Sequence, residues 1–217
     1  MNALLQVRNV GIEFGGVRAL QDVSFDVADG IICGLIGPNG AGKTTLFNAI
    51  SRVYQVSRGT INVLLGAHHR LQPGFLNAVF GKGAVIDPVA TEEEAYAILY
   101  DLGLSGVADH LAGGLPFGTL KRIEIARALI SHPRLLMLDE PANGLSHGEV
   151  DELSDVILRV RQRYGLTVLL VEHHMRMLMR ISDRVVVLEN GVKIADGTPA
   201  EVKADPAVAA AYLGAAT

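Results

Sequence analysis

The stretch LIGPNGAGKTTLF, residues 35–47, decides how this sequence folds. Gly37, four further residues and then Gly42-Lys43-Thr44 fit the phosphate-binding pattern G-x-x-x-x-G-K-[ST], and the stretch stands between an apolar run and a helix-compatible segment, as that pattern requires. Ordering a glycine costs more conformational entropy than ordering other residues. A cluster of glycines therefore indicates a place where the backbone must approach a ligand more closely than side chains would allow. We predict that backbone amides curl round a β-phosphate, that Lys43 adds a positive charge toward the β- and γ-phosphates, and that the Thr44 hydroxyl ligates Mg²⁺.

Composition bounds the rest of the interpretation. The chain has 217 residues, 49% of them hydrophobic, and a net charge of -4, which suits one soluble globular body and gives no general electrostatic reason to bind nucleic acid or anionic lipid. Any link to a membrane must then pass through a protein partner. The single cysteine, Cys33, permits no intrachain disulfide, and we find neither a signal peptide nor a run of 18 apolar residues, so we expect the chain in the cytoplasm.

Two textures along the chain predict an α/β fold. Residues 4–28 alternate and carry a turn signal at Gly15-Gly16, which predicts antiparallel strands at one edge. Further on, short apolar runs predict a mainly parallel core sheet covered on both faces, namely residues 31–36, 135–138, 167–171 and 185–188. Helical segments alternate with these runs, at residues 43–52, 118–131, 149–164 and 174–181.

The domain organisation follows from a gap in this alternation. Residues 66–116 contain no core-type strand run, only helix-compatible segments such as 92–102. We therefore predict a helical subdomain over residues 62–116, with residues 1–61 and 117–217 forming the core and its β edge. Capping boxes are predicted at Ser146 with Glu149 and at Thr91 with Glu94.

Two acids complete the predicted phosphate site. The run 135–138 ends in Asp139-Glu140, at the carboxyl end of a buried strand, where open α/β sheets bind ligands. We predict that Asp139 belongs to the Mg²⁺ shell and that Glu140 polarises the attacking water as general base. The alternative, a merely solvated strand end, is disfavoured beside the loop at 37–44.

Two further motifs, at residues 115–119 and 172–173, follow the phosphate loop along the chain. Leu115-Pro116-Phe117-Gly118-Thr119 opens a helix, and Glu172-His173 closes the following strand. Together with the loop and the acids, they resemble the ATP-binding subunit of ABC transporters over nearly the whole chain. The resemblance implies a P-loop ATPase that binds ATP and Mg²⁺, in which Phe14 lies where an aromatic stacks on adenine, with Val17 beside it, and His173 senses the γ-phosphate. Taken alone, Phe14 could be a core aromatic and His173 an ordinary strand-end histidine.

The resemblance also assigns the remaining site residues. Residues 37–45 form the Walker A loop that binds nucleotide: Gly37, Pro38, Asn39, Gly40, Ala41, Gly42, Lys43, Thr44 and Thr45. Residues 115–119 match the signature loop, so Pro116, Phe117, Gly118 and Thr119 would bind the nucleotide of a second subunit in trans. The implied partners are a second ATPase subunit, identical or different, transmembrane permease subunits on the cytoplasmic face of the membrane, and indirectly an extracytoplasmic substrate-binding protein.

A subfamily is indicated by FGGVRAL at 14–20, TLFN at 45–48, VEHHM at 171–175 and the tail from Gly197. These stretches resemble the ATPase subunits of branched-chain amino acid importers. Subunits that serve urea, amide or lipopolysaccharide transport share much of the tail and remain alternatives. A soluble ABC ATPase without a transport role, a small-molecule kinase or GTPase, and a noncatalytic nucleotide sensor fit the motifs less well.

Three departures from the family pattern stand out. Pro116, Phe117 and Thr119 replace the usual residues of Leu-Ser-Gly-Gly-Gln, and Ser146 stands where the D-loop commonly ends in aspartate. The third departure is larger: Ile61 runs straight into Asn62, with no counterpart of the glutamine-containing Q-loop. A few tens of residues are absent at this join. Because their loss should uncouple hydrolysis from transport, we hypothesise that the protein carries this segment; the alternative is that the Q-loop is truly absent. An intact mass of 23.1 kDa would show that the chain is truly this short.

Overall fold

The computed structural model describes residues 3–63, 88–111 and 114–214 of the chain. They fall into two compact units, one formed by residues 1–63 with 134–217 and the other by residues 64–133.

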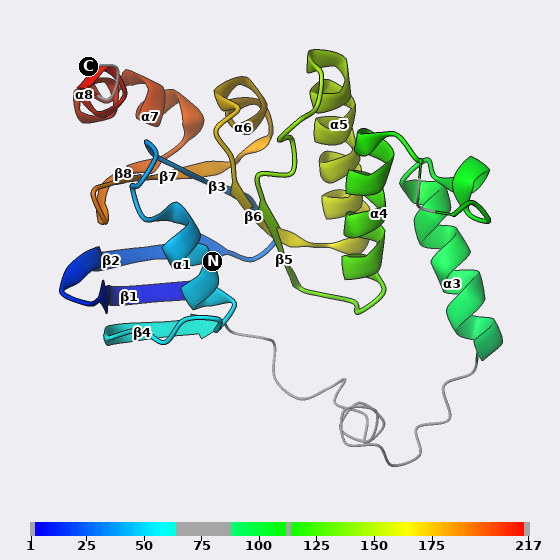
Figure 1. Ribbon diagram of the computed structural model, residues 1–217, viewed down its shortest axis with the longest axis horizontal. Coiled ribbons are helices and arrows are strands. Elements are labelled where there is room, and N and C mark those ends of the chain that lie inside the picture. The colour runs from blue at the N-terminus through cyan, green and yellow to red at the C-terminus, as the bar shows by residue number, and fades with distance from the viewer. Residues whose placement is uncertain (1–2, 64–87, 112–113, 215–217) are drawn as a thin grey trace, which may run out of the picture. The chain divides into compact units, whose positions relative to one another are not determined.

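A five-stranded sheet with the order β5-β6-β3-β7-β8 forms the centre of the first unit (Figure 1). Four strands run parallel to their neighbours, and β8 is antiparallel to β7. The bounds are β3 (Ile32–Ile36), β5 (Leu135–Asp139), β6 (Thr167–Val171), β7 (Arg184–Glu189) and β8 (Val192–Gly197). The four parallel strands lie in the four apolar runs, so the predicted parallel core is confirmed. The strand β8 was not predicted, because its sequence VKIADG lacks the apolar run of a strand covered on both faces.

A smaller antiparallel sheet has the order β2-β1-β4. Its strands are β1 (Ala3–Phe14), β2 (Val17–Ala28) and β4 (Arg58–Val63). Gly15 and Gly16, with φ of 53° and 88°, form the two-residue turn between β1 and β2. A tight hairpin turn that needs positive φ at both positions favours glycine there, so the predicted antiparallel edge is confirmed.

The described residues of the first unit form five helices: α1 (Lys43–Ile50), α5 (His147–Tyr164), α6 (Met175–Ile181), α7 (Pro199–Ala204) and α8 (Pro206–Gly214). The capping box of Ser146 and Glu149 is present at the start of α5, as predicted. Thr198 and Glu201 form the same reciprocal pair at the start of α7, because their spacing also lets each side chain bind a free amide of the first turn.

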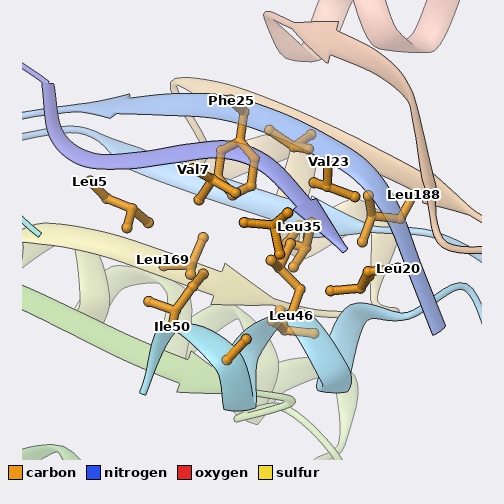
Figure 2. Packing of buried hydrophobic residues seen from close by; sticks show 14 of the residues in the cluster. Leu5, Val7, Leu20, Val23, Phe25, Leu35, Leu46, Ile50, Leu169 and Leu188 are labelled. Carbon is orange, nitrogen blue, oxygen red and sulfur yellow. The ribbon is translucent and has the colours of Figure 1, made fainter. Parts of the chain in front are cut away.

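Two hydrophobic clusters fix these layers. The larger one joins the small sheet, through Leu5, Val23 and Phe25, to Leu35 and other residues of the parallel sheet and to α1 (Figure 2). The second packs Ile36, Val185 and Val187 of β3 and β7 against α6, α7 and α8. The two clusters pack against β3 from both sides, so the segment that follows Ile36 begins at a buried, well-packed strand.

The second unit contains α3 (Pro88–Asp101), the short 3₁₀ helix η1 (Ser105–Val107) and α4 (Phe117–Leu129). The predicted capping box at Thr91 is wrong, because α3 already begins at Pro88, and proline is favoured in the first turn, where no amide partner is lost. Glu94 instead lies 3.0 Å from His132, between its Oε1 and the histidine Nε2. The part of the predicted helical subdomain that spans residues 64–87 lies outside the described residues.

The boundaries of the two units differ from the predicted subdomain ranges. Asn62 and Val63 pair with Gln6 and Leu5 of β1, so β4 continues past the predicted boundary at 61. Helix α4 belongs to the second unit, whereas we had placed residues 117–129 in the core. The reason is packing: Ile98 of α3 and Ile123 of α4 line one apolar groove, which the sequence period of either helix alone does not reveal.

Candidate nucleotide site

The loop between β3 and α1 is shaped by close backbone contacts. A Cβ on Gly37 would lie 2.1 Å from the carbonyl oxygen of Leu188, and one on Gly42 would lie 2.8 Å from that of Ala19. Both distances exclude any larger residue without a shift of backbone. Gly42 is the N-cap of α1 and supplies no side-chain cap, so the first amides of the helix are free to bind an anion.

Lys43 closes the loop from within. Its side chain is mostly buried, with 8% of the residue exposed, and Nζ donates hydrogen bonds to the carbonyl oxygens of Gly37 at 2.8 Å and Pro38 at 3.0 Å. Desolvation lowers the pKa of Lys43, and the negative charges of Glu140 and Asp139 oppose that shift. The lysine therefore lies within electrostatic reach of both predicted acidic residues.

A cavity of about 570 Å³ joins the loop to Glu140. This volume lies in the range of small-molecule and cofactor sites. Its lining comprises Val17, Arg18, Ala19, Gln21, Asn39, Gly40, Ala41, Gly42, Lys43, Thr44, Thr45, Glu140 and Asn190. The structure thus brings most of the predicted loop residues, Val17 and the predicted general base to one cavity, which we call the loop cavity.

Four lining residues were not predicted from the sequence: Arg18, Ala19, Gln21 and Asn190. Asn190 forms a tight turn between β7 and β8 with Gly191, whose amide donates to the carbonyl oxygen of Ala41 at 3.1 Å. The Gln21 amide donates to the Gly191 carbonyl at 2.7 Å. An Asn-Gly pair between two strands is a hairpin signal that could have placed the turn, although not its contact with the loop.

The two acids follow directly from β5. Asp139 pairs with Val171 of β6, and the Glu140 amide donates to the Val171 carbonyl at 2.8 Å. Glu140 has a φ of 45°, a left-handed conformation that a residue other than glycine adopts only when its surroundings impose it. Burial raises the pKa of Asp139, the charge of Glu140 adds to this effect, and Lys43 opposes it. A cation beside Asp139 would relieve the same unfavourable charge.

His173 lies close to the predicted general base. It follows β6, and its Nδ1 is 3.8 Å from Oε1 of Glu140, a contact that becomes an ion pair when the histidine is protonated. Both side chains remain about half exposed, at 49% and 40%. The structure therefore brings together two side chains from separate strand ends. The sequence showed the order of their motifs along the chain but not that they lie close together.

The predicted base-binding end is more open. Phe14, 46% exposed, ends β1 and makes an edge-to-face contact with Tyr54, the ring centroids being 5.2 Å apart. Phe14 is not among the residues that line the loop cavity, whereas Val17 across the hairpin is. Tyr54 was not predicted, because no motif links it to the end of β1.

The predicted trans-acting residues lie in the second unit. Pro116 is the N-cap of α4 and provides no side-chain cap, while its carbonyl accepts from the amides of Thr119 and Leu120. Phe117 is 49% exposed, and Lys121 Nζ stands 5.3 Å from the centre of its ring. Their binding of a second subunit's nucleotide stays a prediction.

The donor set suits Mg²⁺ only together with phosphate. The described part of the chain has no group of three or more His, Cys, Asp or Glu side chains able to hold a metal by themselves. The Thr44 hydroxyl and the Asp139 carboxylate are oxygen donors, and Mg²⁺ in nucleotide sites is commonly bound by one or two such groups plus substrate phosphates and water. These residues therefore fit the ion.

Comparison with known proteins defines the class. A family model described as ABC transporter matches residues 20–143, and one described as branched-chain amino acid ATP-binding cassette transporter matches residues 192–217. The chain belongs to the ABC transporter family and is an ABC-type ATPase, which confirms the predicted resemblance and fold class. No helix among the described residues has the length and hydropathy needed to cross a membrane.

Particular relatives narrow the comparison. The chain is 35% identical to the high-affinity branched-chain amino acid transport ATP-binding protein BraF of Pseudomonas aeruginosa and 34% identical to LivG of Salmonella typhimurium, and each alignment covers 98% of both chains. It is also similar to the ADP conformation of MJ1267, an ATP-binding cassette of an ABC transporter, with a TM-score of 0.84 and 28% identity over 99% of this chain and 100% of that one.

Proposed function

We propose that this chain is the ATP-hydrolysing motor subunit of an importer for branched-chain amino acids. The observation that carries the motor role is the loop cavity, which Lys43 and Glu140 line together. The transported substrate is supported by the names of BraF and LivG and by the family match over residues 192–217.

Nucleotide binding in this proposal exchanges one set of contacts for another. Phosphates accept hydrogen bonds from the free amides at the start of α1, and Lys43 Nζ moves from the carbonyls of Gly37 and Pro38 to phosphate oxygens. Thr44 and Asp139 would hold Mg²⁺, which when bound neutralises charge on the phosphates. Phe14 stacks on the base at the open end.

Hydrolysis depends on the contact between Glu140 and His173. Glu140 accepts a proton from the attacking water as general base, while His173 donates a hydrogen bond to the γ-phosphate. Their separation of 3.8 Å lets both side chains reach one reacting centre. The left-handed backbone of Glu140 directs its carboxylate into the cavity that also holds Lys43.

Coupling to transport requires further subunits. The start of α4, residues 116–119, where Pro116 and Phe117 are exposed, covers the nucleotide of a second ATPase subunit, so ATP binding closes a two-subunit sandwich. Hydrolysis reopens it, because ATP and its products favour different states. Permease subunits at the cytoplasmic face of the membrane receive this motion, and an extracytoplasmic binding protein supplies the substrate to them.

The alignment length supports a second part of the proposal: a segment that relatives carry is missing from this chain, although not between Ile61 and Asn62, which lie in one continuous strand. The alignment with BraF spans 252 positions, while this chain has 217 residues, so at least 35 positions (252 − 217) have no residue here. Because the alignment covers 98% of both chains, those positions are internal. We propose that the missing segment includes the Q-loop, so that a chain without it drives less uptake per ATP hydrolysed than a chain that carries it.

Purification with native partners followed by reconstitution tests the proposal. We expect two different permease subunits and a second ATPase subunit to accompany the chain. Vesicles holding the complex should take up leucine in an ATP-dependent manner that Glu140→Gln abolishes. Recovery of urea or lipopolysaccharide transport components instead would contradict the substrate, and ATP turnover with no uptake would contradict the transport role.

A further inference from the structure

Glu172 is a buried carboxylate for which the proposed mechanism has no use. It follows β6 directly, and the residue is 1% exposed. An ionised or protonated carboxyl in such a position is costly unless its oxygens find hydrogen-bond partners. The hydrogen bonds of Glu172 therefore show what this side chain does in the fold.

Both oxygens of Glu172 are used. Oε1 accepts a hydrogen bond from the amide of Ala142 at 2.8 Å, and Oε2 accepts from the amides of His173 at 3.1 Å and His174 at 3.2 Å. The first bond spans 30 residues of sequence and the other two are local. One side chain thus ties the segment after β5 to the segment after β6.

These two segments carry the predicted catalytic pair. Ala142, fully buried, lies two residues after Glu140, whose own amide donates to the Val171 carbonyl at 2.8 Å. The segment around Glu140 is therefore attached to the end of β6 at two points, one through backbone and one through Glu172. His173, held at its amide by the same carboxylate, lies 3.8 Å from Glu140.

We infer that Glu172 is a positioning residue that holds Glu140 and His173 in one arrangement by binding the backbone of both segments. This inference rests on the proposed function of Glu140. The left-handed backbone of Glu140 needs such support, since a strained backbone conformation persists only where surrounding structure imposes it. Without Glu172 only the backbone bond from Glu140 to Val171 still holds the segment after β5 to the end of β6, and the general base is displaced from its working position.

Glu172→Gln tests the inference in the purified full chain. Glutamine keeps the size of the side chain, but its NH₂ group is a donor and cannot accept a hydrogen bond from a backbone N–H. Either the bond to Ala142 or the bonds to His173 and His174 are therefore lost. We expect kcat to fall by about 10²-fold, as small displacements of catalytic groups do, while ATP affinity and KM change less than about threefold, because the loop around Lys43 is untouched. A loss confined to KM would overturn the inference.

A double variant separates positioning from general stability. If Glu172 acts through Glu140, adding Glu172→Gln to Glu140→Gln should slow turnover by less than about threefold beyond Glu140→Gln alone, because residues of one unit are not additive. Independent, multiplied losses would overturn the inference. Ser154→Ala is the matched control: Ser154 is equally buried, its hydroxyl donates to Val150 at 2.7 Å within α5, and its loss should leave kcat unchanged.

Glu172→Asp covers the case in which the glutamine variant does not fold. It keeps the charge and can still bind the adjacent His173 amide, but it is too short to reach Ala142, so it should show the same fall in kcat. Full turnover in Glu172→Asp would overturn the inference. Reduced turnover in Glu140→Gln with normal turnover in the Glu172 variants overturns the inference alone, whereas normal turnover in Glu140→Gln overturns the proposed catalytic role and the inference with it.

Discussion

The phosphate end and the base end of the candidate site are built differently. At the phosphate end, Lys43 is nearly buried and glycines pack against neighbouring carbonyls, so the loop has little freedom to take another form. At the base end, Phe14 and Val17 are 46% and 68% exposed on a hairpin. We propose that nucleotide affinity and chemistry depend chiefly on the phosphate end, and that the base end adds a modest, replaceable contact.

The largest expected effect is that of Glu140→Gln on turnover. Loss of a general base should slow hydrolysis by about 10²-fold or more while ATP binding is retained, because the glutamine keeps the shape of the cavity. Steady-state phosphate release and equilibrium ATP binding measure the two quantities separately. A fall of less than about threefold would rule out the role of Glu140.

Lys43→Ala should chiefly weaken ATP binding. A hydrogen bond to a charged group contributes about 1.5–3 kcal/mol, so its loss corresponds to roughly 10- to 100-fold in Kd. Calorimetric titration with ATP checks this value, with Lys203→Ala, an exposed lysine of α7, as the control. Unchanged affinity in Lys43→Ala would contradict the placement of the phosphates.

Phe14→Ala probes the base end and should have a smaller effect. An aromatic contact contributes about 0.5–1.5 kcal/mol, so Kd should rise by roughly 2- to 10-fold, and equally for ATP and ADP, because the two share the base. Tyr100→Ala on α3, where the side chain is 73% exposed, is the control. A loss as large as that of Lys43→Ala would break the contrast between the two ends.

The smallest expected effect concerns Asp139 and pH. The pKa of Asp139 is raised, chiefly by burial, so the folded protein holds this proton more tightly than the unfolded chain. Stability is then lost as pH rises from the ordinary carboxyl range through the raised pKa. Asp139→Asn should therefore unfold at a higher temperature than the natural chain near neutral pH, with the difference vanishing in acid.

A charge-matched control variant and a measurement of ATP affinity accompany that experiment. Asp22→Asn removes an exposed carboxylate that pairs with Arg58 and lies outside the loop cavity, so it should not reproduce the gain. Asp139→Asn should also reduce the gain in ATP affinity that Mg²⁺ provides. Stabilisation that is the same at acid and neutral pH would contradict the account of this carboxylate.

Local sequence predicted the loop and the strand and helix that flank it, for a physical reason. Apolar runs determine buried strands, and the glycine pattern determines the loop, so 35–47 and the acids after 135–138 could be placed without any long-range contact. Arg18, Gln21 and Asn190 could not, because they reach the loop cavity only through the packing of the β7–β8 turn on β2. Glu172 was noted beside His173, yet its bond to Ala142 depends on how two strand ends meet.

The second unit shows the same limit. The start of α3 was misplaced, because a serine- or threonine-based capping signal at Thr91 competed with a proline that could begin the helix earlier. The membership of α4 in the second unit depends on its packing with α3, which no periodicity within residues 117–129 expresses. The predicted start of this helix, at residue 118, is still within one residue of Phe117, because Pro116 is disfavoured inside a helix and marks its beginning.

A crystal structure of the chain with Mg²⁺ and a non-hydrolysable ATP analogue tests the central claim most directly. The account predicts phosphates bound by the amides of residues 37–45, Lys43 Nζ on phosphate oxygens in place of the Gly37 and Pro38 carbonyls, and Glu140 facing the γ-phosphate. A nucleotide outside the loop cavity, with Lys43 still bonded to both carbonyls, would contradict it.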